Sequence, residues 1–112
     1  MTAPLPIEID CRSVKSQLDD GAEFILVDCR EPDEHAVVHI EAATLLPMSQ
    51  FAQRAAELDS HRASHVVVHC HHGGRSRRVV EWLRQQGFEK AQSMAGGIDQ
   101  WAVDIDSSLP RY

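Results

Sequence analysis

One short segment, residues 70–76, gathers the residue types that nucleophilic sulfur chemistry requires. It reads C-H-H-G-G-R-S and begins with Cys70. A cysteine attacks as its thiolate, and this form is stabilised by a nearby cation or by backbone N–H groups that converge on it. Gly73 and Gly74 permit the tight loop that such convergence needs, and Arg75 supplies a permanent positive charge. The segment therefore predicts an acidified, nucleophilic cysteine.

The residues on either side of this loop predict the elements that hold it. Residues 65–69 read HVVVH, a β-branched run typical of a buried strand, which would deliver Cys70 to a sheet edge. Ser76 can cap a helix that ends at Gly87 and has its apolar residues on one face. The positive end of that helix would add to the anion site. We therefore expect a strand, an anion-binding loop and a helix in succession.

The rest of the chain alternates between short apolar runs and helical periods. Strands are expected at residues 7–9, 24–27, 44–46, 65–69 and 91–94. Helices are expected at residues 11–20, 32–37, 48–58, 77–86 and 98–102. This alternation predicts an α/β fold with a central parallel sheet of about five strands and helices on both faces. Ligands of such sheets bind beyond the carboxyl ends of the strands, where Cys70 would lie.

Length and composition narrow the class of protein. A chain of 112 residues has the length of one domain, and we expect residues 1–112 to form a single one. Its 43% hydrophobic and 25% charged residues exclude a disordered tail. No apolar run approaches the ~20 residues that span a bilayer, so no membrane partner is expected. The first ten residues lack the basic and apolar regions of a secretory signal, which makes the cytoplasm the expected compartment.

The charge distribution points to a small anionic ligand. The chain has a formal net charge of −6, yet Arg75, Arg77 and Arg78 place three positive charges within four residues. An acidic chain with one compact basic site is a poor match for nucleic acid, which binds extended basic surfaces. We therefore expect a small anion as the ligand and no nucleic-acid partner.

The three cysteines, Cys11, Cys29 and Cys70, have no paired spacing, which argues against a disulfide framework. Their number fits a reducing compartment in which a thiol is kept for chemistry. Cys11 and Cys29 are interpreted as buried thiols, and Cys70 is the predicted nucleophile.

Four short motifs occur in order along the chain. They are D-x-R-E-P-x-E, C-x-x-G-x-R-[ST], G-G-I-x-x-W and a closing P-x-Y. The matching residues are Asp28, Arg30, Glu31, Pro32 and Glu34, then Cys70, Gly73, Arg75 and Ser76, then Gly96, Gly97, Ile98 and Trp101, and finally Pro110 and Tyr112. With these motifs the chain resembles the rhodanese-like domains, a family of sulfurtransferases, over nearly its whole length. A further family pattern, G-H-I-x-G-A, is matched in part, since Val38 and Ala42 replace its two glycines.

The resemblance implies a rhodanese-like fold and a sulfurtransferase mechanism. The Cys70 thiolate would take the outer sulfur of a small anionic donor such as thiosulfate, carry it as a persulfide, and pass it to a thiol, a protein acceptor or cyanide. The residues that would bind the anion are His71, His72, Gly73, Gly74, Arg75 and Ser76. Asp28 and Arg30 would support the loop as an ion pair. Neither a cofactor nor a metal is implied, and the oligomeric state is left open.

Three alternatives stand beside this interpretation. One is a regulatory or interaction module that keeps the fold without turnover, and another is a relay whose donor is a protein persulfide. The third is a phosphatase or arsenate reductase, whose C-x5-R loop is one residue longer, whereas four residues separate Cys70 from Arg75 here. Within the main interpretation, Cys29 is a possible second thiol that resolves the persulfide, because its strand would end near the loop.

Overall fold

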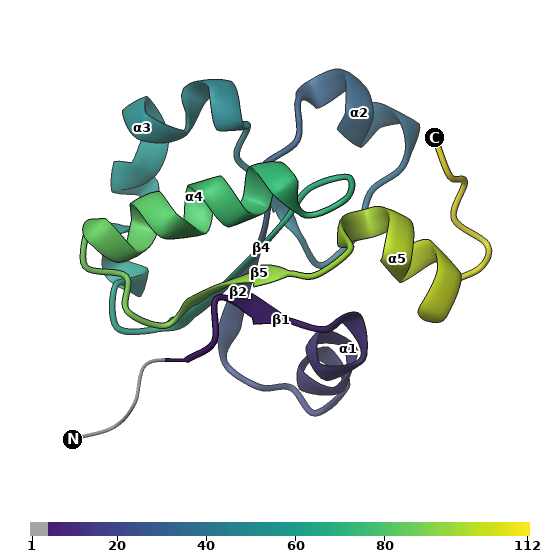
Figure 1. The fold of residues 1–112 in the computed structure, drawn as a ribbon, viewed down its shortest axis with the longest axis horizontal. Helices are drawn as coiled ribbons and strands as arrows, with labels where there is room; N and C mark the ends of the chain where they lie inside the picture. The colour runs from purple at the N-terminus through teal and green to yellow at the C-terminus, as the bar shows by residue number, and fades with distance from the viewer. Residues whose placement is uncertain (1–4) are drawn as a thin grey trace.

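The fold is built around one parallel sheet (Figure 1). The computed structural model describes residues 5–112. The first four residues of the expected domain lie outside it. They also belong to the N-terminal stretch that lacks the features of a secretory signal. The strands are β1 Glu8–Ile9, β2 Phe24–Asp28, β3 Thr44–Leu45, β4 His65–His69 and β5 Ala91–Met94. They lie in the order β1-β5-β4-β2-β3, and every neighbouring pair is parallel. The predicted five-stranded parallel sheet is confirmed.

Helices cover both faces of the sheet, as predicted (Figure 1). They are α1 Cys11–Asp19, α2 Pro32–Val37, α3 Phe51–Arg54, α4 Gly74–Gln85 and α5 Gly97–Asp104. On one face, α3 and α4 pack in an apolar cluster with Val66 and Val68 of β4. On the other face, α1 and α5 pack with Val67 and Met94. Across residues 5–112, no helix has the length and apolar character needed to cross a membrane.

The strand β4 is central because it is apolar on both faces. Its three valines, residues 66–68, are fully buried between the two helical layers. It pairs with β2 along its whole length and ends with His69 opposite Asp28. The two strands therefore stop at the same level, and the residues that follow them meet at one edge of the sheet.

The segment after β3 departs from the prediction of one helix over residues 48–58. It forms a 3₁₀ turn at Met48–Gln50, then α3, then a second 3₁₀ segment at Ala55–His61. Phe51 and Leu58 are nevertheless buried against the sheet. Both side chains can reach the sheet from 3₁₀ turns as well as from a continuous α-helix. The apolar periodicity therefore predicts a longer helix than the structure contains.

A buried ion pair follows β2 and ties it to α2. Arg30 Nη2 lies 2.6 Å from Asp28 Oδ2, and Arg30 Nε lies 2.9 Å from Asp28 Oδ1, with both side chains fully buried. The guanidinium also donates to the backbone carbonyls of Glu34 and Val38 and to the Tyr112 hydroxyl. Burial alone would raise the pKa of Asp28, but the hydrogen bonds from Arg30 hold it below its ordinary value. The pair is thus charged and fixes the turn into α2.

Replacing Asp28 by Asn should lower the free energy of unfolding by about 3–5 kcal/mol, because Asp28→Asn leaves the Arg30 charge buried without a counter-charge. Urea denaturation followed by circular dichroism measures the change. Asp19→Asn, which breaks the exposed Lys15–Asp19 pair, is the control and should leave stability nearly unchanged. Equal stability of Asp28→Asn and the wild type would contradict a charged, buried pair.

Candidate active site

Cys70 lies at the turn between β4 and α4. Gly73 has a φ of +110°, which glycine adopts without steric cost, and α4 begins directly after it at Gly74. The prediction that Ser76 caps this helix is therefore wrong, because the sharp turn at Gly73 starts the helix earlier and leaves Ser76 inside the first turn. A Cβ on Gly74 would meet nothing within 4 Å. Of the two glycines, only Gly73 is demanded by the loop geometry.

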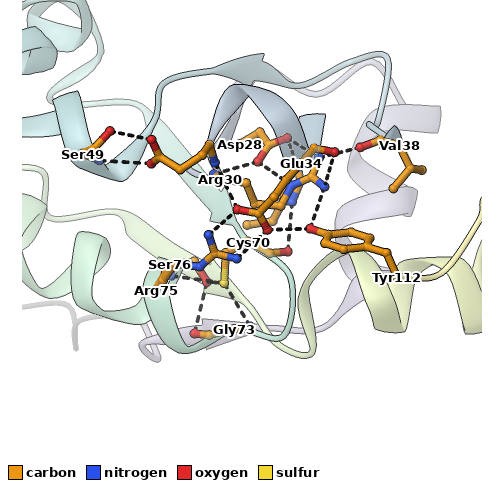
Figure 2. A network of polar contacts seen from close by, with 12 residues as sticks. Asp28, Arg30, Glu34, Val38, Ser49, Cys70, Gly73, Arg75, Ser76 and Tyr112 are labelled. Atoms are coloured by element: carbon orange, nitrogen blue, oxygen red, sulfur yellow. Dashed lines mark hydrogen bonds and ion pairs between the residues drawn. The ribbon is translucent and has the colours of Figure 1, made fainter. Parts of the chain in front are cut away.

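Hydrogen-bond donors surround the Cys70 sulfur (Figure 2). Its Sγ lies 3.1 Å from the backbone nitrogen of Gly73 and 3.4 Å from that of Ser76. Ser76 Oγ lies 3.4 Å from the same sulfur and 2.7 Å from Ser93 Oγ. The Ser93 hydroxyl can therefore donate to Ser76 while Ser76 donates to a thiolate. Because the cysteine is almost fully buried, these donors take the place of water around a negative sulfur.

These surroundings acidify Cys70. A hydrogen bond from the Cys29 thiol, together with those from Ser76 and Gly73, lowers the pKa of Cys70 to about 4 against the opposing effect of burial. The same contact with Cys70, together with burial, raises the pKa of Cys29 far above its ordinary value. At neutral pH, Cys70 is therefore a thiolate and Cys29 keeps its proton.

The N-terminus of α5 holds the opposite side of the loop. The backbone N–H of Ile98 donates to the Cys70 carbonyl at 2.9 Å. That of Asp99 donates to the His71 carbonyl at 3.1 Å. A Cβ on Gly97 would lie 2.5 Å from both carbonyl oxygens, so this close approach requires glycine. With its carbonyls bound to α5, the loop turns its N–H groups toward the sulfur.

Arg75 is bound to α2 and does not project freely over the loop. Its Nη1 and Nη2 donate to the Glu34 carboxylate at 2.6 and 2.8 Å. The Tyr112 hydroxyl donates to the same carboxylate at 2.8 Å (Figure 2). The hydrogen bonds from Arg75 and Tyr112 lower the pKa of Glu34 to about 2, and Glu34 raises the pKa of Arg75. The Glu34 carboxylate therefore offsets part of the Arg75 charge that we expected to bind the anion. The ion pair of Arg75 and Glu34 also anchors the loop to α2.

Asp28 and Arg30 are connected to the Cys70 loop through other side chains. Arg30 Nη1 donates to the Tyr112 hydroxyl at 2.9 Å. Tyr112 in turn donates to Glu34, which holds Arg75. A continuous chain of hydrogen bonds therefore joins the buried ion pair to the loop (Figure 2).

His71 and His72 flank the loop in different environments. The His71 ring is partly buried and stacks on the Tyr112 ring, with centroids 3.8 Å apart and an angle of 5° between the planes. His72 is exposed, and its Nδ1 lies 3.9 Å from the Asp99 carboxylate. In the part of the chain that the structure describes, no three His, Cys, Asp or Glu side chains are placed to hold a metal ion. Substrate contact by the two histidines stays a prediction.

Four side chains that the sequence did not assign to the anion site complete it, namely Cys29, Glu34, Ser93 and Tyr112. Glu34 and Tyr112 stand in matched motifs, but their contact joins residues 78 positions apart and depends on the fold. Ser93 reaches the loop because β5 sets it opposite Val68 of β4. A serine within a fully buried strand is the sequence signal that points to it.

Cys70 should react with iodoacetamide at a rate that is constant through neutral pH and falls as the pH drops through about 4, because the thiolate is the reactive form. Intact-mass spectrometry of the alkylated protein measures the rate at each pH. Cys70→Ser is the control and should stay unlabelled, since Cys11 and Cys29 are both buried and burial raises the pKa of Cys11 to about 11. A midpoint near the ordinary thiol value of about 8.5 would contradict an acidified cysteine.

Comparisons with known proteins show the family to which the chain belongs. The family described as Rhodanese-like domain matches residues 10–104. The chain is 38% identical over 95 residues to a sulfurtransferase from Allochromatium vinosum, which covers 85% of this chain and 87% of that protein. It is 31% identical over 114 residues to an adenylyltransferase and sulfurtransferase from Zea mays. That match covers 97% of this chain but only 24% of the maize protein.

A solved structure has a similar fold. The crystal structure of a thiosulfate sulfurtransferase from Pseudomonas aeruginosa is similar with a TM-score of 0.77 at 25% identity. The match covers 86% of this chain and 18% of that one. The chain thus spans about a quarter or less of some relatives and most of others. Since the family match runs from the start of α1 to the end of α5, the chain belongs to the rhodanese-like domain family.

Proposed function

We propose that this chain moves sulfane sulfur from a small anionic donor, with thiosulfate as the first candidate, to a thiol acceptor through a persulfide on Cys70. The observation that carries the proposal is the pair of backbone N–H groups, from Gly73 and Ser76, at 3.1 and 3.4 Å from the Cys70 sulfur. Donors placed in advance hold the thiolate before the reaction. The loop can also stabilise the anionic outer sulfur of the persulfide afterwards.

In the first half-reaction, the Cys70 thiolate attacks the outer sulfur of thiosulfate. A bond forms between Sγ and that sulfur, the sulfur–sulfur bond of thiosulfate breaks, and sulfite leaves with the electron pair. A dianion enters a nearly buried site only where positive groups receive it. The N-terminus of α4 and its first backbone N–H groups supply them.

In the second half-reaction, an acceptor thiolate or cyanide attacks the outer sulfur of the persulfide, and Cys70 leaves as a thiolate. A thiol of low pKa is a good leaving group in exchange at sulfur. The surroundings that lower the pKa of Cys70 to about 4 therefore assist both halves of the reaction. Because the donor product leaves before the acceptor reacts, the kinetics should be ping-pong.

The relatives and the thiols support the choice of donor, acceptor and compartment. One relative is named a sulfurtransferase and a structural neighbour a thiosulfate sulfurtransferase, which makes thiosulfate the donor to try first. The three cysteines of this chain are free. Free thiols persist in a reducing compartment such as the cytoplasm, where small thiols and protein thiols can act as acceptors.

Two observations weigh against the other functions considered. A binding module without turnover gains nothing from a thiol whose pKa is lowered to about 4. A phosphatase or arsenate reductase must surround a tetrahedral oxyanion. Here the short loop draws the N–H groups of Gly73 and Ser76 onto the sulfur itself, which suits a single anionic atom better than an oxyanion.

Cys70→Ser should reduce thiocyanate formation from thiosulfate and cyanide by at least about 1,000-fold, because a hydroxyl oxygen cannot carry sulfane sulfur. Initial rates are measured by the colour of the ferric thiocyanate complex. Double-reciprocal plots of the wild type at several cyanide concentrations should be parallel. Intersecting lines, or activity retained in Cys70→Ser, would contradict the covalent intermediate.

Arg75→Ala should raise the KM for thiosulfate about tenfold, a loss of about 1.4 kcal/mol, because the loop loses both a cation and its anchor on Glu34. Arg78→Ala is the matched control, since it removes the same charge from an exposed position on the same helix. Steady-state kinetics over a range of thiosulfate concentrations measure both. The same rise in both variants would show that general charge, and not the anchored loop, attracts the donor.

A further inference from the structure

Cys29 and Cys70 occupy matching positions at the ends of neighbouring strands. The strands β2 and β4 are parallel and in register up to Asp28 opposite His69. The backbone N–H of Cys29 donates to the His69 carbonyl at 3.0 Å, so the pairing continues one step beyond the strands. That step sets Cys29 beside Cys70 at the carboxyl edge of the sheet.

The two side chains also lie on the same face of the sheet. Alternate residues of a strand share a face. The apolar cluster beneath α4 contains Val27 and Cys29 from one chain segment and Val68 and Cys70 from the other. Neighbouring strands lie about 4.8 Å apart, within the Cα separations of about 4.4–6.8 Å at which a disulfide can close. The placement of the two cysteines therefore permits a bond between their sulfurs.

The two thiols also affect each other, because Cys29 lowers the pKa of Cys70 and Cys70 raises that of Cys29. Both side chains are buried, Cys29 fully and Cys70 with 1% of its surface exposed. The mechanism above uses this contact only to stabilise the thiolate. The Cys29 sulfur forms no covalent bond in it. A thiol held against a cysteine that carries a second sulfur is placed for exchange.

Resting on the persulfide of the proposed function, we propose that Cys29 is a resolving thiol that discharges the Cys70 persulfide as hydrosulfide. The Cys29 sulfur attacks Cys70 Sγ, a bond forms between the two cysteine sulfurs, and the bond from Sγ to the outer sulfur breaks. The outer sulfur leaves with the electron pair, takes the Cys29 proton and departs as HS⁻. The sulfane sulfur is reduced to sulfide while the two cysteines are oxidised to a disulfide, so protons, charge and electrons balance.

The closed disulfide stops further loading until a reductant opens it. The inference therefore adds a second class of acceptor, a dithiol, which reduces the Cys29–Cys70 bond and makes the release of sulfide catalytic. An outside thiol or cyanide competes with Cys29 for the same persulfide. Because Cys29 stays protonated at rest and a thiol is a weaker nucleophile than a thiolate, the internal route is the slower of the two.

Cys11 offers a matched control for the experiment. It is nearly as buried as Cys29, but it belongs to the apolar cluster on the opposite face of the sheet. Its Sγ lies 3.7 Å from the Ala95 carbonyl oxygen and 3.9 Å from that of Gly97. Replacement of Cys11 by serine therefore changes a buried thiol without touching the Cys70 sulfur.

Wild-type protein, Cys29→Ser and Cys11→Ser are loaded with thiosulfate, freed of donor by gel filtration, and kept without oxygen or acceptor. Released sulfide is measured as methylene blue, and the intact mass of each protein is followed. The wild type and Cys11→Ser should release about one equivalent of sulfide and end about 2 Da below the reduced mass. Cys29→Ser should keep the added sulfur and release less than about a tenth as much sulfide.

A wild type that keeps the added sulfur, with no sulfide and no Cys29–Cys70 peptide after non-reducing digestion, would overturn this inference and leave the persulfide mechanism standing. Release by Cys29→Ser at the wild-type rate would also overturn it. If neither thiosulfate nor a small persulfide adds sulfur to wild-type Cys70, the proposed function and this inference fall together. If Cys29→Ser takes up no sulfur, Cys29→Ala is tested in its place. The presence or absence of the Cys29–Cys70 peptide in the wild type then decides whether the disulfide forms.

Discussion

The negative sulfur at the end of β4 is the charge around which the rest of the site is arranged. A buried anion is costly unless hydrogen-bond donors replace the water that it has lost. The backbone N–H groups of Gly73 and Ser76 supply this replacement. They face the sulfur because the positive φ of Gly73 turns the chain and because α5 binds the carbonyl groups of the loop from outside. Since these donors are in place before any reaction, they need no reorganisation when the charge moves to an added sulfur.

The loop is held by charged groups that lie outside it. The buried Asp28–Arg30 pair fixes the turn after β2, and α2 then presents Glu34 to Arg75. Tyr112 connects the two pairs, since its hydroxyl accepts a bond from Arg30 and donates one to Glu34. A buried or half-buried charge must keep its partner, so the members of this network restrict one another. Residues remote from the sulfur thus set how well the donors are aligned with it.

Local sequence predicts the parts of this arrangement that local physics decides. Residues 65–69 predict β4 because a strand buried on both faces must be apolar along its length, and the loop composition predicts an anion site at its end. Contacts between distant segments are different. The sequence predicts Arg75 as a cation of the anion site but not its partner Glu34, which lies 41 residues away along the chain. A serine is a common cap and so predicts a helix that starts after Ser76, whereas the dihedral angle of Gly73 starts α4 at Gly74.

Intact-mass spectrometry after a short incubation with thiosulfate tests the central claim most directly, namely that Cys70 binds sulfane sulfur covalently. The wild type should gain about one sulfur mass, lose it when cyanide is added, and show no gain after Cys70→Ser. The early sampling time separates loading from any later discharge within the protein. A wild type that gains no mass from thiosulfate or from a small persulfide donor would contradict the claim.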